Sequence, residues 1–337
     1  MTDPIRSTPR LKARRACLGA ALAVGLLAHG APQAQTAMAY PQKTIRLVVP
    51  FPPGGYADNL SRLIASDLSQ TFGHPVVVEN RAGAGGMIGA DAVAKSVPDG
   101  YTLLMGTIGT HAINSALYRK MTYDALKDFA PIAFVADAET VLVVPPASAS
   151  RTVAALIAQA KARPDQVTYA SAGPGSTSHL TGELFKSATE TAIVHVPYKG
   201  NSPALTDLMA GQVSLSFATM QTALPFIRSG KLAALATLGA SRSAALPSVP
   251  TLEEAGVKGV LARNWIGLFA AAGTPEPILA RLAGETDRIM RSPDVQAKLQ
   301  NEGLKYTAMG PEAFAAFVRG EAAQWAKVVR AVGVQAD

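Results

Sequence analysis

A turn rich in proline and glycine, residues 52–58, carries the strongest sign of ligand chemistry in this sequence. It follows a β-branched run at residues 45–49 and precedes apolar residues at helical spacing, so it should join a buried strand to a helix. The prolines fix the chain direction, and the glycines can take positive φ and leave backbone amides unobstructed. Because the helix also brings the positive end of its dipole to this turn, the pattern predicts an anion site.

Two later loops, residues 106–110 and 171–177, also place small hydroxyl residues and free amides between a strand and a helix. In open α/β sheets ligands bind at the carboxyl ends of strands, so the three loops can converge on one pocket. Asp58 lies in the first helical turn, where capping the helix and contacting the ligand are both open roles. The expected ligand-binding residues of the loops are Phe51, Pro53, Gly54, Gly55, Tyr56, Asp58, Thr107, Thr110, Ser171, Gly173, Gly175, Ser176 and Thr177.

Signals for enzymatic or nucleotide chemistry are weak. The glycine-rich residues 83–89 resemble a dinucleotide fingerprint, but the acidic residue expected about 20 positions later is missing, which favours a plain loop at the rim of a cleft. No G-x-S-x-G elbow is present. We therefore expect no catalytic residue, no metal and no cofactor. A catalytic triad assembled from residues far apart in the sequence remains an open alternative, because no local motif would mark it. The histidines without metal-site spacing are His74, His111, His179 and His195; we expect His195 in the core and His179 bonded to backbone.

The N-terminus has the pattern of a secretion signal. Arg14 and Arg15 precede an apolar run at residues 16–28, and an A-x-A cleavage site ends at Ala39. The run is too short to span a bilayer, for which a helix needs about 20 residues. We expect cleavage near Ala39 and a periplasmic protein, with cleavage after Gly30 and twin-arginine export as open alternatives. The single cysteine lies in this leader, so the mature chain has no disulfide.

The charge pattern gives no support for a nucleic-acid partner, and we expect none. The formal charge is +7, but five basic residues against one acid in the leader carry four of these charges, which leaves +3. The remaining charges are spread singly, without a basic stripe. About 298 residues follow the leader, more than one hydrophobic core usually serves, so we expect two domains.

Strand-like and helix-like segments alternate along the mature chain, which predicts an α/β fold with parallel strands and crossover helices. Few of the strands alternate polar with apolar residues, as expected when both faces are covered. The last helix should bury its aromatic stripe. The expected strands are residues 45–49, 76–78, 102–105, 141–144, 167–170, 193–196, 213–217, 232–237 and 266–270.

In combination, several segments resemble Bug-type substrate-binding proteins of the tripartite tricarboxylate transporter (TctC-like) family. The resemblance covers nearly all of the mature chain. It is carried by residues 40–41, 50–58, 77–86, 98–104, 128–131, 195–200 and 246–251.

This resemblance implies a type II-like periplasmic-binding-protein fold, a two-lobed "Venus flytrap" in which each lobe is a mostly parallel sheet flanked by helices. Lobe 1 would comprise residues 40–141 and 243–337, lobe 2 residues 142–242, with hinges near residues 141–146 and 237–243. It also implies capture of a small organic carboxylate by amides and hydroxyls of residues 52–58 and 171–177, often through water. Membrane components of a tripartite tricarboxylate transporter would receive the ligand from a monomeric protein.

Two departures from the family pattern bear on the ligand. Ala218 and Thr219, which we also expect to contact the ligand, stand where relatives commonly carry Asp-Asn, and the loss of an acid argues against a ligand with an amino group. Tyr56 replaces a common threonine, and its ring can stack on a flat ligand or fill space. Among the mono- and dicarboxylates that the resemblance allows, these changes favour a dicarboxylate or an aromatic acid. A ligand-sensing adaptor and a periplasmic enzyme are the alternative functions.

Overall fold

The computed structural model describes Met1, residues 40–260 and residues 262–335. Apart from Met1, the predicted leader therefore lies outside the described residues. Residues Pro41–Asp337 form one compact unit. Within the described part of the chain, none of the helices combines the length and the apolar composition that a membrane crossing requires.

One group of strands is ordered β2-β1-β3-β9-β4. β1 pairs in parallel with β2 and β3, whereas β9 is antiparallel to β3 and β4, and the short β10 is antiparallel to β4. Helix α2 packs on β1 and β2, and α11 packs on β4. The elements here are β1 (Ile45–Val49), α2 (Tyr56–Phe72), β2 (Val76–Asn80), a 3-10 turn (Ala84–Gly86), α3 (Met87–Ala94), β3 (Thr102–Thr107), a π-turn η2 (Gly109–Ile113), α4 (Asn114–Leu117), β4 (Phe129–Val144), β9 (Arg263–Ala271), α9 (Glu276–Met290), α10 (Pro293–Asn301), β10 (Leu304–Lys305) and α11 (Pro311–Val332).

The other group is ordered β4-β7-β5-β6, with β8 also paired to β4. β5 is parallel to β6 and β7, whereas β4 is antiparallel to β7 and β8. Its elements are α5 (Val153–Ala162), β5 (Thr168–Ser171), α6 (Thr177–Thr189), β6 (Val194–Pro197), α7 (Asn201–Met209), β7 (Leu215–Thr219), α8 (Met220–Arg228) and β8 (Ala233–Thr237). The expected α/β alternation is confirmed, with both parallel and antiparallel neighbours in each group.

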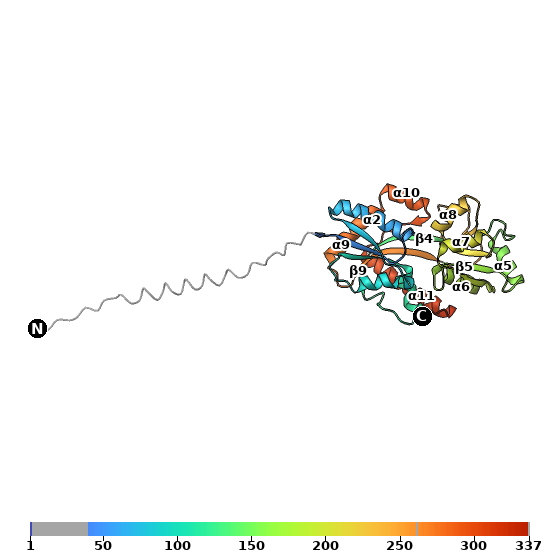
Figure 1. The fold of residues 1–337 in the computed structure, drawn as a ribbon, viewed down its shortest axis with the longest axis horizontal. Coiled ribbons are helices and arrows are strands. Elements are labelled where there is room, and N and C mark those ends of the chain that lie inside the picture. The colour runs from blue at the N-terminus through green and yellow to red at the C-terminus, as the bar shows by residue number, and fades with distance from the viewer. Residues whose placement is uncertain (2–39, 261, 336–337) are drawn as a thin grey trace. The chain divides into compact units, whose positions relative to one another are not determined.

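Strand β4 belongs to both groups. Residues 129–139 pair with β9, and residues 140–144 pair with β7 and β8 (Figure 1). The sequence predicted only residues 141–144 as a strand, because Pro131, Asp137 and Glu139 argue against a buried strand. The structure accommodates Pro131 at a register shift and pairs both acids with cations from neighbouring strands.

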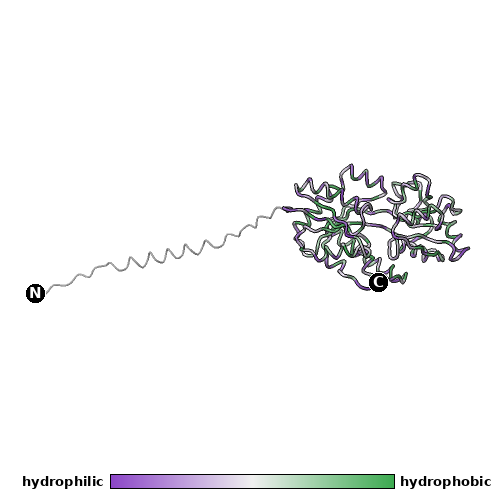
Figure 2. Tube along the Cα trace, viewed as in Figure 1, coloured by the Kyte–Doolittle hydropathy of each residue, from purple (hydrophilic) through white to green (hydrophobic). Residues whose placement is uncertain are grey.

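Each group of strands has its own apolar interior (Figure 2). Trp265, Phe269 and Phe314 are central to the first, and Tyr169 and Phe217 to the second. The aromatic stripe expected on the last helix is buried there, with Phe314 and Trp325 almost inaccessible to solvent. These residues therefore support the fold and leave the site to the loops at the strand ends.

Candidate ligand-binding site

The three predicted loops meet at one cavity of about 670 Å³. Residues 51–58 form one part of its wall, Thr107 to Gly109 another, and residues 174–178 a third. The predicted convergence of the loops is thus present in the structure. The expected site residues that line the cavity are Phe51, Pro53, Gly54, Gly55, Tyr56, Asp58, Thr107, Gly175, Ser176, Thr177 and Thr219.

The start of α2 presents backbone donors to this cavity. Gly55 is the residue before the helix, and no side chain caps it. The first amides of a helix have no partner within the helix, so those of α2 remain available to a ligand. Gly54 adopts φ +92°, the left-handed conformation that favours glycine, and its amide donates to Asp58 Oδ2 at 3.0 Å. The amides after Gly54 are therefore the donors on this wall.

Asp58 is a structural support beneath the turn. The residue is 2% exposed, and its two side-chain oxygens accept hydrogen bonds from the amide of Gly54, the guanidinium of Arg62 and the amide group of Asn80. Burial opposes ionisation of this carboxyl, but the bonds from Arg62, Gly54 and Asn80 outweigh burial and hold the pKa of Asp58 below its usual value. These contacts make Asp58 a support of the turn before α2, because its bond goes to Gly54, ahead of the helix, and not to the uncapped first amides of the helix.

Tyr56 extends from the first residue of α2 toward the interior. Its hydroxyl donates to the carbonyl oxygen of Asn264 at 3.2 Å. Burial, with a contribution from the nearby charge of Asp137, raises the pKa of this phenol above its usual value. The ring therefore closes one side of the cavity as a neutral phenol, in agreement with the space-filling alternative.

The loop at residues 171–178 uses most of its donors internally. The amide of Ala172 donates to Ser178 Oγ, and those of Gly173 and Gly175 donate to Ser171 Oγ and His179 Nδ1. Ser176 caps α6, since its Oγ accepts from the amide of His179. The amides of Thr177 and Ser178, at the start of α6, are left to face the cavity.

Thr107 and Thr110 close the third loop on itself. Each amide donates to the hydroxyl oxygen of the other residue, and Thr110 Oγ1 also bonds His111 Nδ1 at 2.8 Å. Thr110 is fully buried and does not reach the cavity. Three other expected residues also lie behind the wall and not on it: Ser171, Gly173 and Ala218. Ala218 lies inside β7, opposite Val141, because that strand continues two residues beyond its predicted end.

Two helix starts on the cavity wall were not predicted as sources of donors, although Thr219, the residue before α8, was itself an expected ligand contact. Gly200, Asn201 and Ser202 line the cavity at the start of α7, and Thr219, Gln221 and Thr222 line it at the start of α8. Neither helix has a side-chain cap. The glycine at position 200 before a helix is the same signal as Gly55, whereas nothing marks α8 in sequence. Further lining residues that the sequence did not indicate include Asn114, Leu117, Tyr118, Phe217 and Asn264.

The cavity wall offers helix starts and no cationic side chain from the described residues. Among the described residues that line it, none is Lys, Arg or His, and its one acid, Asp58, is paired with Arg62 at 3.0 Å. The starts of α2, α6, α7 and α8 all contribute to the wall. Each helix start carries about half a positive charge, so the four together offer roughly two charges to a ligand.

Comparison with known proteins identifies the family. Residues 60–334 match the model of the tripartite tricarboxylate transporter family receptor, TctC. The chain belongs to this family. TctC receptors are solute-binding proteins, and this receptor is 40% identical to protein BugT of Bordetella pertussis over 297 residues, which is 88% of this chain and 91% of BugT.

Solved structures of TctC proteins have the same two-lobed periplasmic-binding-protein fold. The receptor superposes on R. palustris Rpa4515 with adipate at a TM-score of 0.82 and 38% identity, covering 88% of this chain and 99% of that one. It superposes on MatC from Rhodopseudomonas palustris with bound malate at a TM-score of 0.77 and 34% identity, covering 86% of this chain and 100% of MatC. Superposition on periplasmic binding protein BugD gives a TM-score of 0.77 at 33% identity, covering 88% of this chain and 99% of BugD. The expected fold and family are therefore confirmed.

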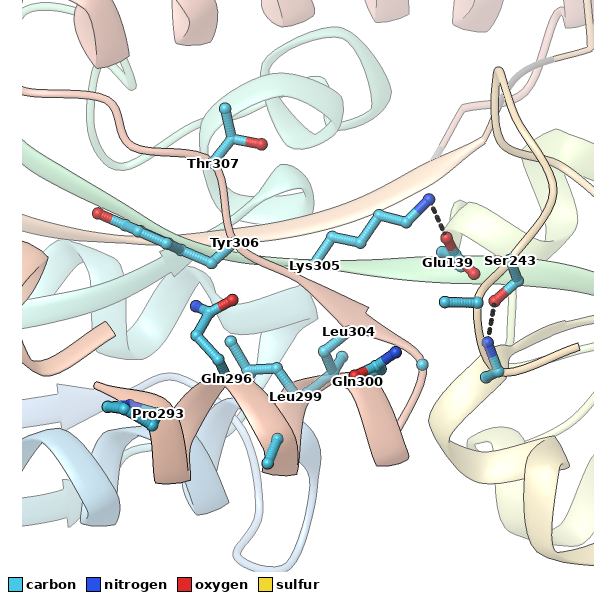
Figure 3. A pocket seen from close by; sticks show the side chains of 14 residues that line it. Glu139, Ser243, Pro293, Gln296, Leu299, Gln300, Leu304, Lys305, Tyr306 and Thr307 are labelled. Atoms are coloured by element: carbon cyan, nitrogen blue, oxygen red, sulfur yellow. Dashed lines mark hydrogen bonds and ion pairs between the residues drawn. The ribbon is translucent and has the colours of Figure 1, made fainter. Parts of the chain in front are cut away.

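The TctC receptor has a second cavity of about 520 Å³ between α10, β10 and residues 243–245. None of the three loops reaches it. Figure 3 shows Lys305 extended toward Glu139, whose carboxylate lies 2.5 Å from the ammonium nitrogen. Glu139 is 6% exposed, and its carboxylate oxygens accept no hydrogen bond from the described residues. The ion pair with Lys305 is therefore the interaction that offsets the burial of this charge.

Replacing Lys305 with methionine should therefore destabilise the receptor by about 2 kcal/mol, because Glu139 would remain buried without a counter-charge. Urea unfolding measures this. The double variant Glu139→Leu/Lys305→Met should recover most of the loss, since an apolar pair has no charge to compensate. Equal losses in the single and double variants would show that the pair does not act as one unit.

Proposed function

We propose that this receptor captures a small organic carboxylate in the cavity of about 670 Å³ and delivers it to membrane components of a tripartite tricarboxylate transporter. The observation that carries the proposal is the convergence of four helix starts on a cavity that is lined by no basic side chain of the described residues. The ligands named for the solved relatives, adipate and malate, are carboxylates and support it. The leader predicted for residues 1–39 supports export to the periplasm.

The preferred ligand is a dicarboxylate with an apolar centre. About two positive charges from the helix starts match a dianion. The start of α2 lies in the wall with the first group of strands, and those of α6, α7 and α8 lie with the second, so each end of the ligand has its own donors. Apolar side chains of Ile113, Leu117 and Phe217 lie in the same wall and suit a methylene chain or a ring.

Capture proceeds by closure of two lobes around the ligand. The proposed lobes are residues 40–141 with 243–337 and residues 142–242, with one refinement. Leu252, Val257 and Val260 pack in the apolar cluster of the second group of strands. We therefore propose that residues 243–260, with Ala262, move with lobe 2 and that the return hinge lies just before β9. The change of partner within β4, between Glu139 and Thr140, supports the other hinge.

A thermal-shift panel of organic acids tests the function. At 100 times its dissociation constant, a ligand that binds only the folded protein adds about 2.7 kcal/mol of stability. We expect adipate or another dicarboxylate to produce this shift. Adipamide has the same carbon chain without charge and should produce none. If no mono-, di- or tricarboxylate stabilises the protein, or if adipamide matches adipate, carboxylate capture is wrong.

A further inference from the structure

Two stacked histidines lie directly behind the cavity wall formed by residues 171–178. The rings of His179, on α6, and His195, on β6, are parallel within 15°, with centroids 3.9 Å apart. His179 Nδ1 lies 3.0 Å from the backbone nitrogen of Gly175, and His195 Nε2 lies 2.6 Å from Ser171 Oγ. Both hydrogen-bond partners belong to the loop that contributes amides to the site.

The bond from Gly175 fixes the protonation state of His179. A backbone amide can only donate, so Nδ1 must accept and the imidazole must be neutral, with its proton on Nε2. A proton added to Nδ1 would place two donors opposite each other. It would also place a positive charge against the neighbouring ring of His195. Protonation is therefore incompatible with the present path of the loop.

Gly175 has little freedom to accommodate such a change. Its φ of +73° is in the left-handed region, and a Cβ added there would lie 2.0 Å from Leu117 Cδ2. The backbone at Gly175 thus contacts α4 across the cavity wall, next to the amides of Thr177 and Ser178. A shift of this residue would alter both the contact with Leu117 and the direction of those amides.

We propose that His179 is a positioning residue that holds the loop in its ligand-binding shape only while its imidazole is neutral, so that acid weakens capture. This inference rests on the proposed function, because it takes the cavity as the ligand site. His195 reinforces the effect, since a charge on either ring opposes a charge on the other.

The charged groups around the pair belong to α6. Glu183 accepts a hydrogen bond from Tyr169 at 2.7 Å and pairs with Lys186 at 3.0 Å, so its negative charge is largely compensated. Burial, and then the neighbouring His179, lower the pKa of His195 to about 4; burial also lowers the pKa of His179. A neutral ring in the folded state and an ordinary pKa near 6.5 in the unfolded state mean that the loop binds fewer protons than the unfolded chain. The stabilisation that the neutral histidine rings give to the loop is therefore complete above about pH 6.5. It decreases as the pH falls toward 4, the pKa of His195.

The decisive variant is His179→Asn. The asparagine side-chain oxygen can take the position of Nδ1 and accept from Gly175, but it does not titrate. Calorimetric titration with adipate between pH 7.5 and 4.5 compares the variant with the wild type, and the protonation of adipate itself affects both equally. We expect similar affinities at pH 7.5 and a loss at pH 4.5 at least about tenfold greater in the wild type, which corresponds to one pKa unit of linkage. Parallel pH profiles would overturn the proposal.

His74→Asn is the matched control. His74 bonds the carbonyl of Phe72 at 3.1 Å and lies outside the cavity wall, so its replacement should leave the wild-type pH profile unchanged. If His74→Asn flattens the profile as much as His179→Asn does, the assignment to His179 is wrong.

A measurement without ligand separates this inference from the proposed function. The amide resonance of Gly175 should titrate with the pKa of His179 in the wild type and stay constant in His179→Asn. A Gly175 resonance that is constant with pH in the wild type, in the range where the protein remains folded, would overturn the inference even if adipate binds. A titrating resonance with no carboxylate binding would contradict only the function.

Discussion

Replacing Gly55 with valine should reduce carboxylate affinity at least about 100-fold while leaving the fold intact, a loss of about 2.7 kcal/mol of binding free energy. Gly55 has φ −79° and ψ 167°, which valine adopts readily, and a Cβ added there meets no other part of the chain within 4 Å. The branched side chain would stand at the start of α2, where the ligand carboxylate must approach the amides. Isothermal titration and thermal unfolding measure the two quantities separately.

Gly310→Val is the matched control for this variant. Gly310 precedes α11 as Gly55 precedes α2, with φ −68° and ψ 176°, without a side-chain cap, and with no atom within 4 Å of an added Cβ. It lines neither cavity. The control should bind like the wild type. If Gly55→Val binds the carboxylate with wild-type affinity, the start of α2 is not part of the binding site.

Replacing Asp58 with alanine should lower the free energy of unfolding by about 3 kcal/mol, because the change removes a buried acceptor from several donors, one of them charged. It should also weaken binding, since the amide of Gly54 loses the bond that fixes the turn. Urea unfolding with and without adipate measures both effects. Because the pKa of Asp58 is lowered, its stabilisation is complete above its ordinary pKa of about 4 and is lost as the pH falls through the lower folded value.

Asp67→Ala is the control on the same helix. Asp67 is part-exposed, so its loss should change stability by no more than about 0.5 kcal/mol. If Asp58→Ala kept wild-type stability and lost only ligand binding, Asp58 would be a ligand contact and not a support of the turn.

The α/β alternation was predictable because most strands here are short, apolar and separated by helices with clear start signals. Strand β4 shows where this reasoning ends. Asp137 and Glu139 are stable inside the sheet only because Arg263 and Lys305 reach them from β9 and β10, more than 100 residues later in the chain. Compensation of this kind is tertiary, and no local pattern indicates it.

The convergence of the three loops was also predictable, but the use of their donors was not. Glycines and hydroxyls mark a loop that can bind an anion, yet Ser171, Gly173 and Gly175 direct their polar groups to one another and to His179. The start of α8 was missed for the opposite reason. Thr219 was expected from its place in the family pattern, but Gln221 and Thr222 belong to no recognisable motif, and only the fold brings that helix start to the cavity.

The absence of Lys, Arg and His from the described wall of the cavity has a consequence for how such receptors diverge. Where a lysine or arginine holds an anion, one mutation removes the attraction. In the site that we propose, the attraction comes from main-chain amides, which every residue except proline supplies, so no single codon encodes it. Under this proposal, side chains such as Phe217, Leu117 and Tyr118 can change during evolution to fit new carbon skeletons, while the proposed affinity for the carboxylate is inherited with the fold.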